Sequence, residues 1–271
     1  MAKGRRGTGH LRPLEAAIGF LLWNSLLMRY SPYLTPTKLA KLWGVRPIGV
    51  LHIGAHEAEE TAYYEAAGWG FVTWVEGNAE KVGALNQKLP AASNRVVEAF
   101  AWDIDFAELN FWVLSDSASS SLFRPTEHLA LYPEKPIVKE ERAVGRRLDQ
   151  LLTNETRFEF ISVDVQGAEL QALRGLGSRI AEAKWILAEV NQRDLYEGCT
   201  RVEDLDAFLA GVGFKRTSTL WVPGKGWGDA LYSRVGLTDQ QAKPLHRFFQ
   251  RFEVLFGELY LYLADIKQKL L

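Results

Sequence analysis

Short apolar runs alternate with amphipathic segments from residue 48 onward, and this alternation restricts the fold more than any other feature of the sequence. Five of the runs are predicted as strands, at residues 48–53, 71–75, 95–101, 158–163 and 185–190. Four of them are followed by a predicted helix, at 57–67, at 79–89, up to Leu173 and at 202–209. Strands that alternate with helices form a parallel sheet with helices on both faces. The sequence therefore predicts an α/β fold.

The last two apolar runs are joined differently. Pro223–Gly226 links Phe214–Trp221 to Asp229–Arg234, and a short link rich in glycine and proline is typical of an antiparallel hairpin. Together with the five earlier strands, the hairpin completes a mostly parallel seven-stranded sheet with an antiparallel edge.

Charge and cysteine content exclude several classes of function. The chain has 32 basic and 33 acidic residues, so no overall field attracts nucleic acid, and no nucleic-acid partner is expected. Cys199 is the only cysteine, which rules out an intramolecular disulfide framework or a thiolate zinc cluster. A reducing compartment is the simpler interpretation, so we expect a cytoplasmic protein.

Polar residues gather where the predicted strands end. In open α/β sheets, ligands bind at the carboxyl ends of the strands. The residues at or just after predicted strand ends are Gly54, His56, Glu76, Asp103, Asp164 and Glu189. A single acid after a strand is usually a helix cap or a loop residue, but several at one edge favour a binding site.

The loop after the first strand argues against a dinucleotide ligand. A GxGxxG fingerprint that started at Gly54 would place glycines at positions 56 and 59, which here are His56 and Glu59. Glu57, Glu59 and Glu60 would also repel a pyrophosphate. S-adenosylmethionine has no phosphate but carries a sulfonium, an ammonium and a ribose diol, which suit a glycine loop with nearby acids. Glu76 follows Gly54 by 22 residues, close to the spacing of about 20 at which an acid contacts ribose hydroxyls.

Several segments in this order resemble one known family. They are GVLHIGAHEAEETAYYEAAGWGFVTWVEGNAEKVGALNQKL, RRLDQLL, FISVDVQGAELQALRG, ILAEVNQRDLYEG, FLAGVGF and WGDALYSR, spread over residues 48–235. The chain resembles FkbM-family methyltransferases in these segments, most specifically in DVQGAE. The resemblance implies a class I methyltransferase, Rossmann-like fold, S-adenosylmethionine as methyl donor, and O-methylation of a sugar, glycan or secondary metabolite.

The resemblance also implies where the donor binds. The expected cofactor-binding residues are Gly54, Ala55, His56, Glu60, Glu76, Gly77, Ala101, Asp103 and Asp164. The chain departs from the family pattern at Ala58, where many relatives have glycine, and at Gly77–Asn78, which replaces a common proline-containing turn. Ala101–Trp102–Asp103 matches an alanine-x-aspartate element only loosely, so donor contacts there are weaker expectations.

Two residues are candidates for the catalytic group. Methyl transfer to a hydroxyl needs alignment and a proton acceptor, because a hydroxyl is a weak nucleophile. Asp164 ends the central strand and is the first candidate; its structural alternative is a helix-capping carboxylate. His56 is the second, because imidazole titrates near neutrality; its structural alternative is a loop residue that hydrogen-bonds the backbone. His52 is expected to be a core histidine, and Glu169 to stabilise a helix dipole.

The acceptor is expected to carry a hydroxyl group on a saccharide or a small metabolite. Glu189 and Asn191 leave the fifth strand on the acceptor side, and Ser120 lies in the SDSASSS segment (Ser115–Ser121). By composition this segment is a flexible linker, whereas the resemblance implies a loop over the active site. Asp164, Glu189 and Asn191 are hard oxygen ligands suited to Mg²⁺, but sequence alone does not show that they converge, and no metal is assigned.

Two other functions compete with a methyltransferase. An NAD-dependent oxidoreductase would have a similar fold, but the missing GxGxxG and the acidic loop weigh against it. A non-catalytic donor-binding or assembly protein on a methyltransferase scaffold would have lost its strand-end polar residues, yet these are nearly all present.

Helical extensions flank the predicted methyltransferase domain. The chain is divided into an N-terminal helical extension at 1–44, the domain at 45–236 and a C-terminal amphipathic helix at 237–271. The apolar stretch Ala16 to Met28 is too short to span a bilayer, and no cleavage site for a signal peptide follows it. Its basic start leaves weak contact with the inner face of the membrane as an alternative to packing on protein.

We predict that the C-terminal helix makes the chain a homodimer. Its apolar residues recur at four- and three-residue spacing: Leu245, Phe249, Phe252, Phe256, Leu259, Leu263, Ile266 and Leu270. Such a seam would otherwise expose a large apolar patch, which soluble monomers rarely tolerate. Light scattering should give a dimer for the full chain and a monomer for a chain that ends at Thr238. A soluble full-length monomer would instead favour docking on Leu14–Met28, and association only with anionic vesicles would favour the membrane surface.

Overall fold

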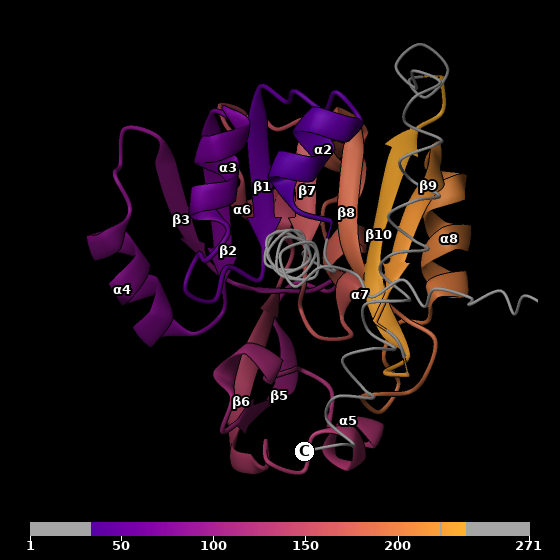
Figure 1. Ribbon diagram of the computed structural model, residues 1–271. Coiled ribbons are helices and arrows are strands. Elements are labelled where there is room, and N and C mark those ends of the chain that lie inside the picture. The colour runs from indigo at the N-terminus through magenta and orange to yellow at the C-terminus, as the bar shows by residue number, and fades with distance from the viewer. Residues whose placement is uncertain (1–33, 223, 237–271) are drawn as a thin grey trace, which may run out of the picture.

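A seven-stranded sheet forms the centre of the computed structural model, which describes residues 34–222 and 224–236 (Figure 1). Its strand order is β3-β2-β1-β7-β8-β10-β9. The parallel strands are β1 Gly49–Ile53, β2 Phe71–Glu76, β3 Asn94–Glu98, β7 Phe160–Val163 and β8 Trp185–Asn191. Antiparallel β10 Trp227–Arg234 pairs with β8 and with β9 Phe214–Trp221. The predicted class I methyltransferase fold with an antiparallel edge hairpin is confirmed.

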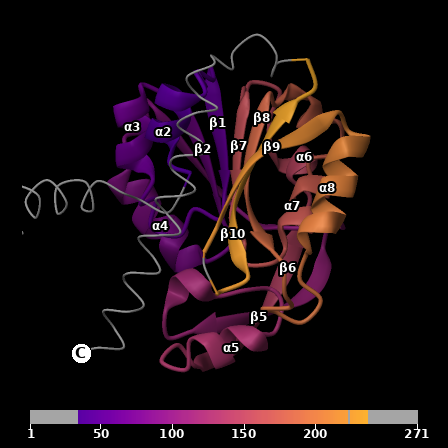
Figure 2. The same cartoon turned by 45° about the vertical axis from the view of Figure 1, so that its right-hand side comes forward.

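Helices cover both faces of this sheet, as Figure 2 shows from the side. One face carries α2 Pro36–Leu42, α3 Thr61–Ala67 and α4 Ala79–Lys88. The other carries α6 Leu148–Leu151, α7 Glu169–Arg174, the 3₁₀ segment η2 Gly177–Glu182 and α8 Val202–Gly211. Side chains alternate along each strand, so Val50 belongs to the core under α2 and α3, and Leu51 to the core under α7 and α8. Polar side chains that follow either series therefore emerge on a defined face.

A second, three-stranded sheet lies below the carboxyl ends of the parallel strands in Figure 1. Its order is β4-β6-β5, with β4 Phe100–Ala101, β5 Ala107–Leu114 and β6 Ile137–Arg146. The prediction of one strand at 95–101 was wrong, because β3 ends at Glu98. The Ala99 N–H still donates to the Glu76 carbonyl of β2 (2.8 Å). The chain then leaves the main sheet, and Phe100–Ala101 pairs with β6 instead.

The helix predicted from Glu57 begins later, at Thr61. Residues 55–60 form a turn in which His56 and Ala58 have φ of 45° and 55°, values that no helix contains. The Ala58 N–H donates to the Ala55 carbonyl (2.7 Å). Gly68, with φ 68°, ends α3 as predicted. This turn keeps the loop after β1 open toward the second sheet.

Helix α2 precedes the predicted domain boundary at residue 45, yet it packs with the body of the fold. Leu34 and Leu39 are buried in the same cluster as Tyr64 of α3 and Leu231 of β10. The boundary remains a prediction, and this packing argues for placing it before residue 34. The helix expected at Leu14–Met28 and the seam at Leu245–Leu270 lie outside the described residues. Among the described residues, no helix is long and apolar enough to cross a bilayer.

We predict that Leu39→Ala lowers the free energy of unfolding by about 2–5 kcal/mol, because Leu39 is fully buried and its truncation leaves a cavity. Lys41→Ala on the exposed side of the same helix should change it by less than about 0.5 kcal/mol. Urea denaturation of the two variants measures both values. Equally small changes would show that α2 is not an integral part of the folded body.

Candidate active site

Two chambers open side by side at the carboxyl ends of the parallel strands, where the second sheet approaches the main one. The first encloses about 300 Å³ beside the ends of β1 and β2, and the second about 500 Å³ beside β7, β8 and β10. Five residues line both chambers: His52, Glu60, Ala118, Asp164 and Gln166. Molecules bound in the two chambers would therefore meet at this junction.

The loop after β1 forms one wall of the first chamber. The N–H groups of Gly54 and Ala55 both donate to the Val75 carbonyl (2.9 and 3.0 Å). Gly54 has φ 92°, and a Cβ there would lie 1.8 Å from the Asp164 carbonyl oxygen. Only glycine permits this approach, because the ends of β1 and β7 touch at this point.

Glu76 extends into the first chamber from the end of β2. Its Oε2 accepts from the His56 N–H and its Oε1 from the Asn78 N–H, both at 2.8 Å. Backbone donors thus hold the carboxylate in one orientation while leaving further lone pairs on both oxygens. A Cβ at Gly77 would lie 2.3 Å from the Phe100 ring, so the turn after Glu76 also requires glycine.

The opposite wall of the first chamber comes from the second sheet and the serine-rich segment. Phe100, Ala101, Phe111 and Val113 supply an apolar surface, and Ser117 Oγ accepts from Lys81 Nζ (3.2 Å). Ser115–Ser121 contains the short 3₁₀ helix η1 Ser117–Ser119 and borders both chambers. It is thus an ordered part of the site and not a linker.

The first chamber fits S-adenosylmethionine by its chemistry. The acid at the end of β2 lies where ribose hydroxyls bind in open α/β sheets, and the apolar wall suits an adenine ring. Glu60 and Asp164, at the far end, provide negative charge for the ammonium and sulfonium groups. Because residue 54 is glycine, the wall of the chamber beside Asp164 is formed there by backbone and by no side chain.

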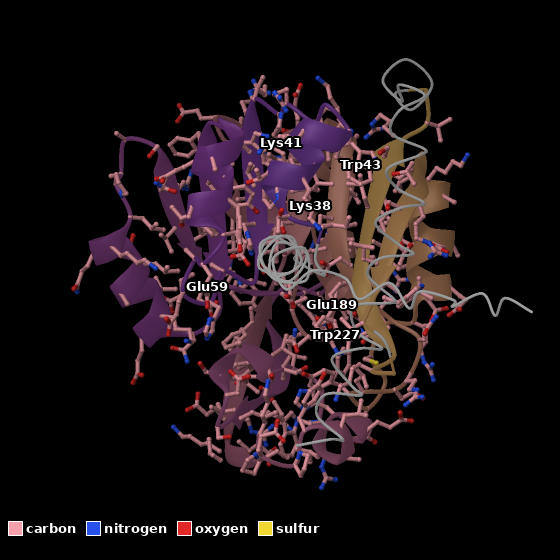
Figure 3. All side chains as sticks on the ribbon, viewed as in Figure 1. Lys38, Lys41, Trp43, Glu59, Glu189 and Trp227 are labelled. Atoms are coloured by element: carbon pink, nitrogen blue, oxygen red, sulfur yellow. The ribbon has the colours of Figure 1, made fainter. Side chains whose placement is uncertain are left out.

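The second chamber combines carboxylates with aromatic side chains. Glu189 of β8 and Asp229 of β10 are opposite one another in the sheet register. Figure 3 shows Glu189 and Trp227 together at the carboxyl end of the sheet. The Trp227 Nε1–H donates to Tyr132 Oη (3.1 Å), and Tyr132 follows α5 Glu127–Leu131. This chamber can therefore accept hydrogen bonds and pack against flat apolar faces.

Gln166 ties the acids of the junction together. Its Nε2 donates to Asp164 Oδ1 (2.7 Å) and to Glu189 Oε2 (3.2 Å). The hydroxyl of the buried Tyr196 donates to Gln166 Oε1 (2.7 Å), which fixes the amide so that its donors face the acids. Gln166 has φ 52°, a left-handed conformation that turns the loop after β7 toward Tyr196.

The enclosed position of the acids changes their protonation. Asp164 is exposed to the cleft, but protein surrounds it otherwise, and loss of solvation raises its pKa. Burial, and then the charge of Asp164, raises the pKa of Glu189 well above its usual range. Burial also raises the pKa of Asp229 to about 7 and lowers that of His52 to about 4. His52 is therefore neutral at pH 7, and Asp229 carries only part of a negative charge there.

Most of the predicted site residues come together. The first chamber is lined by Gly54, Ala55, His56, Glu60, Glu76, Gly77, Ala101 and Asp164. His52 is buried and contacts Tyr64 Oη through Nδ1 (2.9 Å), which confirms it as a partnered core histidine, although it also borders the junction.

His56 lies away from the second chamber. Its Nδ1 contacts Glu59 Oε1 (2.7 Å) and its Nε2 contacts Ser117 Oγ (2.8 Å). Because both ring nitrogens are engaged and the ring borders only the first chamber, the position does not suit a base that acts on an acceptor. His56 instead joins the first loop to the serine-rich segment.

Three further predictions need correction. Asp103 lines neither chamber, because the chain enters the second sheet after Ala101 and Arg147 Nη1 binds the Asp103 carbonyl (2.7 Å). Ser120, expected to contact the acceptor, borders the first chamber, where its Oγ accepts from the Leu114 N–H (3.1 Å). Asn191 is fully buried and lines neither chamber, whereas Glu189 lines the second as predicted.

The sequence analysis did not predict several of the residues that line the site. Phe111 and Val113 lie on β5, whose mixed polar pattern did not predict a strand. Gln166 is part of the DVQGAE segment, but its bridging role depends on Tyr196, 30 residues later. Asp229 lay inside a predicted strand, and an acid in an edge strand is usually solvated. The alternation along β10 was the only available signal.

We predict that the chain binds S-adenosylmethionine and S-adenosylhomocysteine in the micromolar range and does not bind NAD. Glu76→Ala should weaken donor binding by about 1.5–3 kcal/mol, as expected for a lost hydrogen bond to a charged group. Glu98→Ala, an exposed acid beside Glu76 in the β2–β3 register, is the matched control. Calorimetry measures donor binding to the wild type and to both variants. An unchanged affinity in Glu76→Ala would show that Glu76 does not bind the ribose.

Comparisons with known proteins agree with this site. The sequence matches the family described as "Methyltransferase FkbM domain" over residues 52–216, more than half of the chain. No curated protein sequence matched. A TehB-like S-adenosylmethionine-dependent methyltransferase from Corynebacterium glutamicum is 13% identical, with a TM-score of 0.42, over 82% of this chain and 100% of that one. A magnesium protoporphyrin IX methyltransferase from Synechocystis is also 13% identical, with a TM-score of 0.40, over 84% and 86%.

The family assignment rests on the sequence match over residues 52–216. S-adenosylmethionine is the methyl donor of this family, and the first chamber has the groups to hold it. The chain is an S-adenosylmethionine-dependent methyltransferase and belongs to the FkbM methyltransferase family.

Proposed function

We propose that this methyltransferase methylates a hydroxyl oxygen of a sugar, a glycan or a secondary metabolite. The observation that carries the proposal is the junction of the two chambers, where Asp164 and Gln166 border both. A donor in the first chamber and an acceptor in the second would meet there. Holding two reactants in line accounts for about 7–11 kcal/mol of barrier reduction in well-oriented systems.

The lining of the second chamber supports a polyhydroxylated acceptor. Glu60, Asp164, Glu189 and Asp229 present carboxyl oxygens that accept hydrogen bonds from hydroxyl groups. Tyr63, Tyr132 and Trp227 add aromatic surface to the same chamber. Alternating apolar faces and hydroxyl groups are the surface that a sugar ring presents, so this combination favours a saccharide within the proposed class.

The residues of the junction would act on the acceptor as follows. S-adenosylmethionine supplies a methyl group on a positively charged sulfur, which keeps the electron pair of the broken C–S bond. Asp164 accepts the proton of the acceptor hydroxyl as the oxygen forms its new bond to the methyl carbon. Gln166 holds Asp164 in place through the 2.7 Å bond from Nε2. Such a positioned base adds about 10²–10⁴-fold in rate.

Two competing functions are less well supported. A non-catalytic donor-binding or assembly protein would not need a second chamber that shares five residues with the first. An NAD-dependent oxidoreductase would need room for a pyrophosphate at the loop after β1, where Glu59 and Glu60 lie instead. The non-catalytic protein would transfer no methyl group, and the oxidoreductase would bind no methyl donor.

The proposal is tested by product analysis. The full chain is incubated with methyl-labelled S-adenosylmethionine and a panel of saccharides and hydroxylated metabolites, with matched amines as controls. We expect a methyl ether, identified by nuclear magnetic resonance. Labelled methyl on nitrogen or carbon only would overturn O-methylation, and donor binding without transfer to any panel member would favour the non-catalytic alternative.

With an acceptor in hand, we predict that Asp164→Asn keeps the fold but lowers kcat at least about 10²-fold, the lower limit for loss of a positioned acid–base group. Asp204→Asn makes the same change on the exposed side of α8 and should leave kcat unchanged. Thermal unfolding of both variants separates catalysis from stability. Full activity of a stable Asp164→Asn would leave Asp164 as a structural carboxylate.

A further inference from the structure

Three carboxylates converge behind the junction of the two chambers. Asp164 follows β7, Glu169 begins α7 and Glu189 lies near the end of β8. One oxygen from each lies within 4.8 Å of the others. This spacing is close for three acids, because any two ionised carboxylates repel each other strongly where little water separates them.

Glu169 is the member of this cluster with one carboxylate oxygen that has no partner among the described residues. Its side chain is 0% exposed, and it lies in the first turn of α7, as the expected helix-dipole role requires. Oε1 accepts from the N–H groups of Val165 (3.1 Å) and Gly167 (3.0 Å), which hold the carboxylate in place. Oε2 accepts no hydrogen bond from the described part of the chain. A buried carboxylate oxygen without a partner is costly unless a cation or a proton satisfies it.

Asn191, at the end of β8, is a second buried group without a hydrogen-bond partner among the described residues. It follows Glu189 by two residues on β8, so the two side chains leave the same face of the strand. Asn191 is 0% exposed, and neither its amide oxygen nor its amide nitrogen has a partner among the described residues. Buried amides are nearly always hydrogen-bonded or ligated, so Asn191, like Glu169 Oε2, needs a further ligand.

The protein itself provides little compensation for these acids. Within the described part of the chain, no Lys or Arg forms an ion pair with Glu169 or Glu189. The neutral Gln166 amide bridges Asp164 and Glu189, but it does not reach Glu169. The cluster therefore lacks positive charge from described side chains.

Neither reactant of the proposed reaction reaches the whole cluster. Glu189 does not line the first chamber, so the positive groups of the donor do not contact it. An amine on an acceptor could contact Glu189 from the second chamber, but Glu169 lines neither chamber. A single small cation can lie between all three carboxylates, which a larger molecule in either chamber cannot do.

The donor atoms decide which cation would bind. All three are carboxylate oxygens, which Mg²⁺, Mn²⁺ and Ca²⁺ prefer over softer metals. Opposite ligands lie about 4.2 Å apart around Mg²⁺ and about 4.6–5.2 Å apart around Ca²⁺, from metal–oxygen distances of about 2.1 and 2.3–2.6 Å. Oxygens that lie within 4.8 Å of one another fit around Ca²⁺ as they stand, and they would move slightly closer together around Mg²⁺.

We propose that Asp164, Glu169 and Glu189 bind one hard divalent cation at the back of the active-site junction, with the Asn191 amide as a neighbouring polar group. The ion would satisfy Glu169 Oε2 and fix Glu189 and Asp164 where the chambers meet. The site does not depend on the identity of the acceptor. It also extends the oxygen-ligand set considered from sequence by Glu169, whose position only the fold reveals.

The test measures Mn²⁺ binding directly, without an acceptor. Electron paramagnetic resonance and calorimetry of the full chain, with and without S-adenosylmethionine, should give one bound Mn²⁺ per chain. Glu169→Gln keeps an oxygen for the Val165 and Gly167 donors, and it should weaken Mn²⁺ binding at least tenfold while donor binding is retained. Glu189→Gln should do the same, and Glu203→Gln, an exposed acid on α8, is the matched control.

Each outcome decides the proposal. Weakened Mn²⁺ binding in both cluster variants, with the control unchanged, supports the site. No binding to the wild type, or equal binding in all four proteins, overturns it. If Glu169→Gln instead raises the thermal midpoint and no Mn²⁺ binds, the acids share protons and no metal. Methyl transfer that proceeds without Mn²⁺ binding overturns this site alone, whereas Mn²⁺ binding without methyl ether formation overturns only the proposed acceptor.

Discussion

The contact between the ends of β1 and β7 determines the geometry of the whole active site. The Asp164 N–H donates to the Ile53 carbonyl (3.0 Å), and the Asp164 carbonyl lies where a Cβ of residue 54 would be. Because Gly54 has no side chain, the loops after these two strands pass in direct contact. The chamber beside β1 and β2 and the chamber beside β7 and β8 therefore share a wall, and Asp164 lies in it.

Acidic side chains are concentrated in the second chamber, on one side of that wall. Glu60, Asp164, Glu189 and Asp229 line one chamber, and burial raises the pKa of each. The Gln166 amide, oriented by Tyr196, is the neutral donor that holds two of them. This lining supports our proposal of a hydroxylated acceptor, and Glu169 Oε2, which has no partner among the described residues, supports the proposed cation.

The second sheet turns an open strand edge into an enclosed site. In a sheet without it, Glu76 and Asp164 would face solvent. Because the chain leaves the main sheet at Ala99, Phe100 and Ala101 of β4 line the chamber at the end of β2. Strand β5 brings Phe111 and Val113 to the same chamber. The serine-rich segment after β5 then separates the two chambers and joins His56 through Ser117.

The sequence alone predicted the parallel strands and the edge hairpin along the chain, the glycine after β1, and Glu76 and Asp164 at strand ends, because strand periodicity and strand-end polarity are local signals. Only the tertiary structure decided which polar residues meet. Asp103 is carried away by the second sheet, Asn191 is buried, and Glu169 turns inward beside Glu189. These outcomes depend on contacts between residues distant in sequence, such as Gln166 with Tyr196, and pattern along the chain carries no information about them.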